Sequence, residues 1–300
     1  MIELISAVTS RPVDQVEATL RREFANPGST VGSAIAAANI TPHVWSDALE
    51  KFYSESDAFV FELAVWSRNL HKRRMQKWIV NHLSRLGPQS VLCFGDGLGF
   101  DSLELSRNGH HVTYFELPGF SERFARLLFE KSSASVEVCS DTASLPPGKF
   151  DVLVCLDVLE HVPDPAGFVG FLKTFLKPAG RLIVHSPFWL IHPAYATHLS
   201  INRRHAGSLE LYKSNGLQLI DARPTWEPLV LSAASQKQGP APLSGVRYLA
   251  VKVVGLVLSL ARLSPVPFHP LHKIRVARNR WFESGPKSRG SIGAVENRRS

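Results

Sequence analysis

The chain has 300 residues, 44% of them hydrophobic and 20% charged, which is ordinary for a folded soluble protein with one main domain and extensions. Its net charge of +8 is uneven, because residues Leu271–Ser300 hold eight Lys or Arg against two Glu and so carry +6. The rest of the chain carries only +2. The basic character therefore gives no reason to expect a polyanion such as nucleic acid on the body of the protein.

The three cysteines, Cys93, Cys139 and Cys155, each lie in an apolar stretch typical of a strand. They have neither the spacing of a metal site nor the even number of a disulfide framework. We therefore expect buried thiols, no metal site and a cytoplasmic location. The opening residues Met1–Leu4 lack the basic and long apolar stretches of a secretory signal.

Residues 1–87 are predicted to form a helical extension that precedes the main domain. Two sets of apolar residues repeat there at helical spacing: Phe59, Leu63, Trp66 and Leu70, then Met75, Ile79, Leu83 and Leu86. The basic stretch His71–Arg74 falls between the two sets. We expect this stretch to be a solvated helix face or a junction between helices rather than a phosphate contact.

Residues 88–235 alternate short apolar strands with helical segments, which predicts an α/β fold with a Rossmann-like sheet. We expect seven strands, mostly parallel, with helices on both faces and the last two strands forming an antiparallel pair. Lys177–Gly180 is typical of a turn that precedes a strand. The predicted strands are Ser90–Phe94, His111–Phe115, Ser135–Val138, Val152–Leu156, Arg181–His185, Leu217–Ala222 and Leu229–Leu231, and the predicted helices are Phe100–Asn108, Phe120–Lys131 and Ala166–Leu176.

Residues 236–300 form the third predicted region, which opens with the linker Gln236–Ser244. The following run, Val246–Leu263, is interrupted by charges, and its uncharged portion is too short to span a bilayer comfortably. We expect a helix that packs on the protein, and the alternative is an amphipathic helix lying on a membrane surface. The basic sequence after Pro265 is typical of a disordered tail.

A glycine-rich loop follows the first predicted strand directly. Gly95-Asp96-Gly97-Leu98-Gly99 joins that strand to an amphipathic helix, and glycine permits both the unusual backbone angles and a close approach of ligand to main chain. The free N–H groups at the helix start favour an anionic group. Such a loop also occurs for structural reasons alone, so by itself it indicates only a nucleotide-like ligand.

The second predicted strand ends at Glu116, one βαβ unit beyond the glycine loop. A carboxylate in this position can accept hydrogen bonds from both hydroxyls of a ribose. A solvated charge is the alternative interpretation of a lone glutamate at a strand end. The spacing from the loop favours the ligand role.

The combined pattern resembles the class I S-adenosylmethionine-dependent methyltransferases, especially the methylases of ubiquinone and menaquinone pathways. The matching elements cover about half of the chain in the order and at the spacing of that family: Val91–Gly99, Glu116, Cys139–Thr142, Asp151–Pro163 and Leu176–Pro187. The resemblance implies the fold and the cofactor, S-adenosylmethionine, but not the substrate.

The resemblance also implies roles for individual residues. Gly95, Gly97 and Gly99 would line the methionine part of the cofactor. Glu116 would hold the ribose, and Leu117 would lie against the adenine. Asp141 would lie near the adenine amino group with Thr142 beside it, and Leu156 and Asp157 would flank the sulfonium. One departure stands out, because Cys93 occupies a position in the first strand that is usually acidic. Asp96 or Asp101 could then take over the contact to the amino end of the cofactor.

The expected reaction is in-line displacement at the sulfonium methyl group, with a base needed only if the acceptor must lose a proton. Four histidines follow the fourth and fifth strands, on the side where ligands bind in such sheets: His161, His192, His198 and His205. We rank His161 and His198 first as catalytic candidates. Each is also readily explained as a structural or surface histidine.

Three other functions remain open at this stage. An NAD-linked oxidoreductase would need a comparable loop, although its third glycine usually falls one residue later than Gly99. A nucleic-acid methyltransferase is not favoured, because the usual motif after the fourth strand is absent and the tail offers only Trp281 and Phe282 for stacking. A non-catalytic protein that binds S-adenosylmethionine is the third.

We expect a small-molecule acceptor, either aromatic or lipid-like, while the sequence predicts no oligomeric state. The N-terminal helices and the segment His185–Arg204 would cover the cofactor, and Trp45, Trp66, Phe188 and Trp189 would suit an apolar acceptor, although core packing explains them equally well. Residues 245–300 combine an apolar run with a basic tail, which indicates peripheral contact with a membrane.

Overall fold

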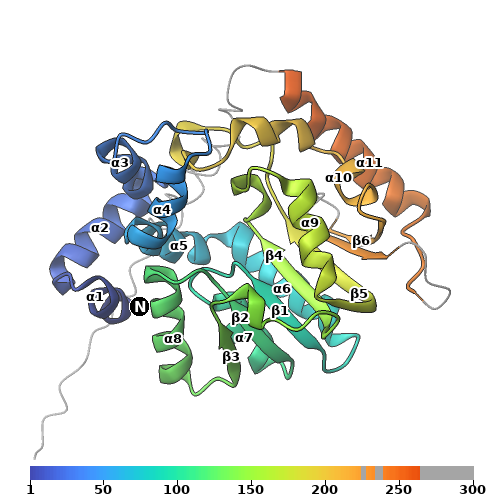
Figure 1. Cartoon of the computed structure of the whole chain (residues 1–300), viewed down its shortest axis with the longest axis horizontal. Helices are drawn as coiled ribbons and strands as arrows, with labels where there is room; N and C mark the ends of the chain where they lie inside the picture. The colour runs from blue at the N-terminus through green and yellow to red at the C-terminus, as the bar shows by residue number, and fades with distance from the viewer. Residues whose placement is uncertain (224–227, 234–238, 264–300) are drawn as a thin grey trace, which may run out of the picture.

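The structure is a computed structural model and describes residues 1–223, 228–233 and 239–263. Its centre is one seven-stranded sheet with the strand order β3-β2-β1-β4-β5-β7-β6 (Figure 1). The strands are β1 Ser90–Phe94, β2 His111–Phe115, β3 Val136–Cys139, β4 Phe150–Leu156, β5 Leu176–His185, β6 Leu217–Ala222 and β7 Leu229–Ala233. Strands β1 to β5 are parallel, while β7 runs antiparallel to both β5 and β6. The predicted fold class is confirmed, including the antiparallel final pair.

The direction of strand addition reverses between β1 and β4. From β1 the chain adds β2 and β3 on one side, and it then returns to add β4 and β5 on the other. The crossover helices leave β1 and β4 in opposite directions, so a crevice opens where these two strands end. Gly95 follows β1 and Asp157 follows β4 at this point.

Alternating residues bury both faces of the sheet. Val91 and Cys93 of β1 pack under α6 Leu70–Ser84 and α7 Phe100–Arg107. Leu92 and Phe94 face a second core formed with α9, α10 and α11. Because both faces are covered, the strands are apolar throughout, as the sequence shows. The remaining covering helices are α8 Phe120–Ser132, α9 Pro165–Thr174, α10 Glu210–Lys213 and α11 Gly245–Ser259.

The N-terminal helices gather at one end of the molecule, on the left in Figure 1. They are α1 Ile2–Thr9, α2 Val13–Ala25, α3 Ser29–Ala37, α4 Asp47–Glu55 and α5 Ala58–Arg68. The chain breaks at Asn69, whose side chain caps α6, so a helix junction does precede the basic stretch. The predicted helix is present as α5, and its fully buried face carries Val60, Phe61 and Ala64. Leu63 and Trp66 of the predicted apolar set are half-buried and face the end of the sheet.

The segment after β5 crosses the carboxyl ends of the strands and meets the N-terminal helices. It contains the short 3-10 helices η3 Pro193–Tyr195 and η4 Ser200–His205, drawn in gold across the top of Figure 1. The His43 amide donates to the carbonyl of Ala196, and the Ser200 amide donates to the carbonyl of His43. Gly28 sits against Ala194 so closely that a Cβ atom there would lie 1.7 Å from the Ala194 oxygen. This segment, residues 186–209, is called the covering segment below.

Several predicted boundaries differ from the structure by one or two residues, and the start of the fifth strand differs by five. Strand β5 begins at Leu176 and not after the predicted turn at Lys177–Gly180. Leu176 already pairs with Phe150, and the register then shifts before Arg181 pairs with Val152. The turn signal thus marks a bulge, with Ala179 at φ 61°, rather than the start of the strand.

Helix α11 lies at the other end of the sheet from the N-terminal helices (Figure 1). It buries Val251 and Gly255 against the protein, and Arg247 pairs with Asp221 of β6. Packing of this helix was expected, and it leaves an apolar outer row exposed. The row comprises Val246, Leu249, Val253, Leu256, Val257, Leu260 and Leu263. No helix in the described part of the chain is long and apolar enough to cross a bilayer.

The short 3-10 helices η1 Thr142–Ser144, η2 Leu159–His161 and η5 Leu260–Leu263 complete the described elements. The three cysteines lie in β1, β3 and β4 as free thiols, with Cys93 and Cys155 buried. The division into residues 1–87, 88–235 and 236–300 stays a prediction. The expected tail after Pro265 and the first part of the linker, residues 236–238, lie outside the described residues.

The close contact at Gly28 predicts a strong effect of one methyl group. In Gly28→Ala the new Cβ would overlap the Ala194 carbonyl, and the backbone is also at φ +84°. We expect the free energy of unfolding to fall by at least about 3 kcal/mol. Gly87→Ala is the matched control, because Gly87 has φ +73° but no atom within 4 Å of the added Cβ. It should cost only about 1 kcal/mol. Equal losses in the two variants, measured by urea denaturation, would contradict the contact.

Candidate functional site

The glycine loop Gly95–Gly99 lies at the carboxyl end of β1 beside the end of β4. Its three glycines have φ values of 72°, 57° and 77°, in the left-handed region that favours glycine. A Cβ at Gly95 would lie 2.6 Å from Val158, and one at Gly97 would lie 2.8 Å from Leu63 of α5. The loop therefore lies between the turn after β4 and an N-terminal helix, and its backbone angles favour glycine at all three positions.

Asp96 binds the start of α7. Its two carboxylate oxygens accept hydrogen bonds from the amides of Asp101, at 3.2 Å, and Ser102, at 2.7 Å. Burial raises the pKa of Asp96 to about 7, and the neighbouring Asp101 adds to the rise. The carboxylate thus acts as a helix cap, which satisfies donors that the helix itself leaves free.

Glu116 lies at the end of β2 and reaches back to the loop. Its carboxylate accepts hydrogen bonds from the Gly97 amide at 2.8 Å and the Leu117 amide at 2.9 Å. Burial raises its pKa, and these two hydrogen bonds oppose the rise. From the other side, the Tyr114 hydroxyl donates to the Gly97 carbonyl at 2.6 Å. Each carboxylate oxygen retains capacity to accept a further hydrogen bond.

The end of β3 brings a third polar group to the same edge of the sheet. Asp141 is exposed and caps the short helix η1 by accepting from the Ala143 amide at 2.9 Å. Thr142 follows it, and the exposed Leu117 lies at the end of the neighbouring strand β2. The ends of β1, β2 and β3 thus carry the glycine loop, Glu116 and Asp141 in the order that the sequence predicts.

Asp157 follows Leu156, the buried last residue of β4, and has a φ of 59°. It accepts a hydrogen bond from Trp66 Nε1 at 2.9 Å and contacts His185 Nδ1 at 2.7 Å. Burial alone would raise its pKa, but His185, Lys72 and Trp66 together hold the pKa of Asp157 well below its usual value. A non-glycine residue held in the left-handed region by several partners is typical of functional sites.

Lys72 is a site residue that the sequence analysis missed. The sequence pattern places Lys72 in a solvated basic stretch, but the structure buries it. Its Nζ pairs with Asp101 at 2.7 Å and lies 4.0 Å from Asp157. Burial alone would lower its pKa, and the two carboxylates outweigh this and raise it. The helical spacing does indicate that Lys72 is buried, because Lys72 lies on the same face of α6 as the core residues Met75 and Ile79.

Two of the four candidate histidines come together. His161 in η2 and His198 in the covering segment have ring centroids 4.8 Å apart, and Tyr53 Oη lies 3.1 Å from His161 Nδ1. Burial lowers the pKa of His161 to about 4 and also lowers that of His198, so both rings are neutral at pH 7. The neighbouring Glu160 is completely buried.

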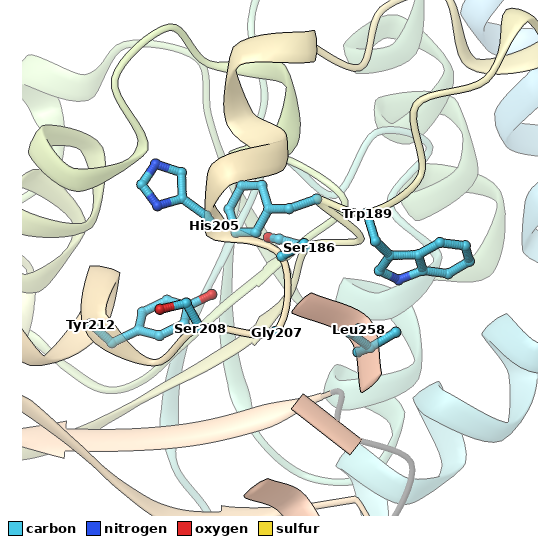
Figure 2. A pocket seen from close by; sticks show the side chains of 9 residues that line it. Ser186, Trp189, His205, Gly207, Ser208, Tyr212 and Leu258 are labelled. Carbon is cyan, nitrogen blue, oxygen red and sulfur yellow. The ribbon is translucent and has the colours of Figure 1, made fainter. Parts of the chain in front are cut away.

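The other two candidates lie elsewhere. His192 accepts from the Ala194 amide and caps η3. His205 lines a separate pocket, and Figure 2 shows it across from Trp189 with Ser186 between them. Leu258 of α11 and Tyr212 of α10 complete its walls. This pocket contains two of the four aromatic residues that we expected around an acceptor, Phe188 and Trp189.

The remaining two aromatic residues are also separated. Trp66 contacts Asp157 at the end of β4, as described above. Trp45 packs in a core among the N-terminal helices, with Ile35, Leu49 and Leu199. Of these four aromatic residues, only Trp66 therefore lies beside the polar groups at the switch point of the sheet, where the direction of strand addition reverses between β1 and β4.

These features define a class of protein: a Rossmann-like α/β domain with a nucleotide-type cofactor site at the switch point of its sheet. Residues 66–219, just over half of the chain, match the family model described as "Methyltransferase domain". The chain therefore belongs to this family, and the resemblance to class I S-adenosylmethionine-dependent methyltransferases is confirmed. Membership makes S-adenosylmethionine the cofactor of the domain.

Several relatives are ubiquinone biosynthesis O-methyltransferases. The one from Xylella fastidiosa (strain 9a5c) is 38% identical over 153 residues, which are 46% of this chain and 61% of the relative. The one from Azotobacter vinelandii is 37% identical over 109 residues, which are 35% of this chain and 47% of the relative. The chain thus spans about half the length of the curated relatives that it matches.

Among the solved structures that the chain matches is magnesium protoporphyrin IX methyltransferase from Synechocystis PCC 6803 with bound S-adenosylmethionine. It has a TM-score of 0.44 and 17% identity, and the match covers 58% of this chain and 84% of that one.

Proposed function

We propose that this protein transfers a methyl group from S-adenosylmethionine to a hydroxyl group of a small molecule. The observation that carries the proposal is the convergence of the glycine loop, Glu116 and Asp157 at the switch point of the sheet. The donor set suits this cofactor, because a carboxylate at the end of β2 can accept from both ribose hydroxyls. A buried ammonium beside the loop, that of Lys72, can pair with a carboxylate.

We assign the cofactor contacts as follows. The ribose would lie on Glu116, and the adenine between Leu117 and the pair Asp141 and Thr142. The sulfonium would lie beside Leu156 and Asp157, where the negative charge of Asp157 favours a cation. The methionine part would follow the backbone of Gly95, Gly97 and Gly99, with Asp96 holding the shape of this loop through its two hydrogen bonds to α7.

The amino-acid end of the cofactor would be held by residues that differ from those usual in the family. Cys93 replaces the usual acid and lies within the sheet core under α6. Asp101 and Lys72 form a buried ion pair nearby, 2.7 Å apart. We propose that Asp101 takes the α-amino group and Lys72 takes the α-carboxylate, which compensates for Cys93.

The cofactor supplies a methyl group already activated by the positive charge on its sulfur. The protein's residues have to orient this group and the acceptor and to keep water out. Leu63 and Trp66 of α5 lie over the glycine loop and Asp157, and the covering segment lies against the turn that follows β4. An acceptor hydroxyl must also lose its proton, so we propose that His161 and His198 contact the acceptor at this step.

The acceptor class is inferred from the relatives and from the site. The relatives named above are O-methyltransferases of ubiquinone biosynthesis, which supports a hydroxyl acceptor on an aromatic or lipid-like molecule. Tyr53 and Tyr195 lie against the two histidines, so the acceptor side is rich in aromatic rings.

The function can be tested by methyl transfer. The full chain, incubated with cofactor labelled in its methyl group and an extract of small molecules, should give labelled products that mass spectrometry identifies. His161→Ala and His198→Ala should lower turnover by about 100-fold or more while the dissociation constant of S-adenosylhomocysteine changes little. His110→Ala is the matched control, because His110 is a buried histidine that directly precedes β2, at the amino end of the parallel strands. Binding of S-adenosylhomocysteine without any labelled product would support a non-catalytic binding protein instead.

The assignment of Lys72 gives a second test. Lys72→Met keeps most of the length of the side chain but removes its charge, so the dissociation constant of S-adenosylhomocysteine should rise by roughly 10- to 100-fold. Binding of 5′-methylthioadenosine, which lacks the amino-acid part, should weaken much less. Lys51→Met, at an exposed position of α4, should alter neither constant. Isothermal titration measures all of these, and equal weakening of both ligands by Lys72→Met would count against the assignment. Tighter binding of NAD than of S-adenosylhomocysteine would reject the function itself.

We further propose that the protein works in the cytoplasm at an anionic membrane surface. The outer row of α11 exposes large apolar side chains, with 63% of Leu249 and 66% of Leu256 accessible. The sequence that follows carries +6 between Leu271 and Ser300. Apolar side chains and clustered positive charge together are what an amphipathic helix needs to bind anionic lipid.

Vesicle flotation tests this proposal. Replacing Leu249, Val253 and Leu256 with Gln should abolish flotation with vesicles that contain anionic lipid, because the apolar contact is lost. The same replacement at Val13, Val44 and Ile201, which are exposed singly elsewhere, should leave flotation unchanged. High salt should weaken flotation of the wild-type protein. Equal flotation of both triple variants would reject α11 as the contact.

A further inference from the structure

Three potential metal ligands meet beside the end of β4. Glu160 and His161 belong to η2, which follows that strand, and His198 comes from the covering segment between η3 and η4. One ligand atom from each residue lies within 4.8 Å of those from the other two. No short ligand motif in the sequence predicts this cluster, because His198 lies far from the other two residues along the chain.

A backbone carbonyl faces the Nδ1 atom of each histidine. His198 Nδ1 lies 2.7 Å from the Leu190 carbonyl oxygen, which only accepts, so this Nδ1 carries the hydrogen and Nε2 carries a free lone pair. His161 Nδ1 lies 3.1 Å from both the Thr197 carbonyl oxygen and the Tyr53 hydroxyl, and the tautomer that donates to Thr197 likewise leaves its Nε2 free. Histidines that bind metals are oriented in just this way, with the second nitrogen donating to a backbone carbonyl or carboxylate.

The two segments that carry these ligands are tied together by other bonds. The buried Asn202 donates through Nδ2 to the carbonyls of Glu160, at 3.2 Å, and Val162, at 2.8 Å. The Leu199 amide also donates to the Glu160 carbonyl at 3.0 Å. The ligand-bearing backbones are thus held in place without an ion, and only side chains need to move.

The required movement is small. Ligand atoms on a tetrahedral zinc ion, with bonds of 2.0–2.1 Å, lie roughly 3.4 Å apart. The three atoms, now within 4.8 Å of one another, therefore need to approach by at most about 1.4 Å. The Glu160 carboxylate has no accessible surface, and a divalent cation beside it would offset the cost of burying its charge.

We propose that Glu160, His161 and His198 bind one divalent transition-metal ion. Two imidazole nitrogens and one carboxylate oxygen suit zinc and also cobalt(II), nickel(II) and iron(II). Three protein ligands leave a coordination position open, and resting on the proposed methyl transfer, this position would take the acceptor hydroxyl. A hydroxyl bound to the ion would lose its proton to water more readily, and its oxygen would then take the methyl group as the carbon–sulfur bond of the cofactor breaks. The ion would thus replace a free histidine base, and His161 and His198 would act on the acceptor through it.

Metal binding can be measured without the methyl-transfer reaction. The full chain is stripped with a chelator and titrated with zinc by calorimetry and with cobalt(II) by visible absorption. We expect one ion per chain and cobalt absorption bands typical of a nitrogen- and oxygen-ligated site. Glu160→Gln and His198→Ala should weaken zinc binding by more than ~100-fold, since changes even in groups behind the ligands cost 10- to 100-fold. His110→Ala should bind as the wild type does.

Titration with S-adenosylhomocysteine keeps the outcomes distinct. Stripped wild type and both variants should still bind it, which shows that they are folded and that the cofactor site is intact. The metal site would be overturned if zinc failed to bind the wild type, or if it bound the wild type and Glu160→Gln equally. The methyltransferase proposal would then still stand. Failure to bind S-adenosylhomocysteine while zinc still binds would count against the proposed function alone.

Discussion

The buried ammonium of Lys72 is the interaction on which the arrangement of the cofactor site depends. It joins three segments that are distant in the sequence: helix α6, the start of α7 at Asp101 and the end of β4 at Asp157. Removing one partner from a buried ion pair leaves an uncompensated buried charge. This destabilises the fold far more than the intact pair stabilises it. The three charges therefore fix one another, and with them the glycine loop that runs between β1 and α7.

This constraint also determines how the N-terminal helices meet the sheet. Helix α5 ends just before α6, so fixing Lys72 in α6 brings Trp66 of α5 against Asp157 and Leu63 against Gly97. From the other side, Gly28 packs on Ala194 and connects α3 to the covering segment. The helices that cover the site are thus attached on two sides, through charge at Lys72 and through close packing and backbone hydrogen bonds at the covering segment. The small size of glycine at position 28 matters as much to this closure as the charge at position 72.

The parts of the site that the sequence predicted are those that strand ends determine. The glycine loop, Glu116, Asp141 and Asp157 each begin within two residues of a strand end, and parallel strands end at one edge of a sheet. Predicting the strands was therefore enough to place these residues together. The turn at Lys177–Gly180 was misplaced because a bulge and a turn use the same residue types, and only the pairing of Leu176 with Phe150 separates them.

Residues whose role depends on packing between distant segments could not be placed in this way. Lys72 looks like part of a basic surface until α6 is docked on the sheet, although its position on the row of Met75 and Ile79 carries the signal. The meeting of His161 with His198 depends on the path of the covering segment, which contains no long element whose period could be read. Periodicity fixes the face of a helix or strand, but it says nothing about where an irregular segment crosses a sheet.

The covering segment also links the acceptor side of the site to helix α11. At its start, the carbonyls of Leu190 and Thr197 face the Nδ1 atoms of the two histidines. Further on, Asn202 binds the backbone around Glu160, and at its end Gly207 packs so tightly on α11 that a Cβ would lie 1.9 Å from the Gly255 oxygen. Packed interiors do not deform freely, so a shift of α11 must move this segment or break that contact. If α11 lies on a membrane, the wall of the acceptor site is therefore held at a defined place relative to the lipid, which suits an acceptor drawn from the membrane.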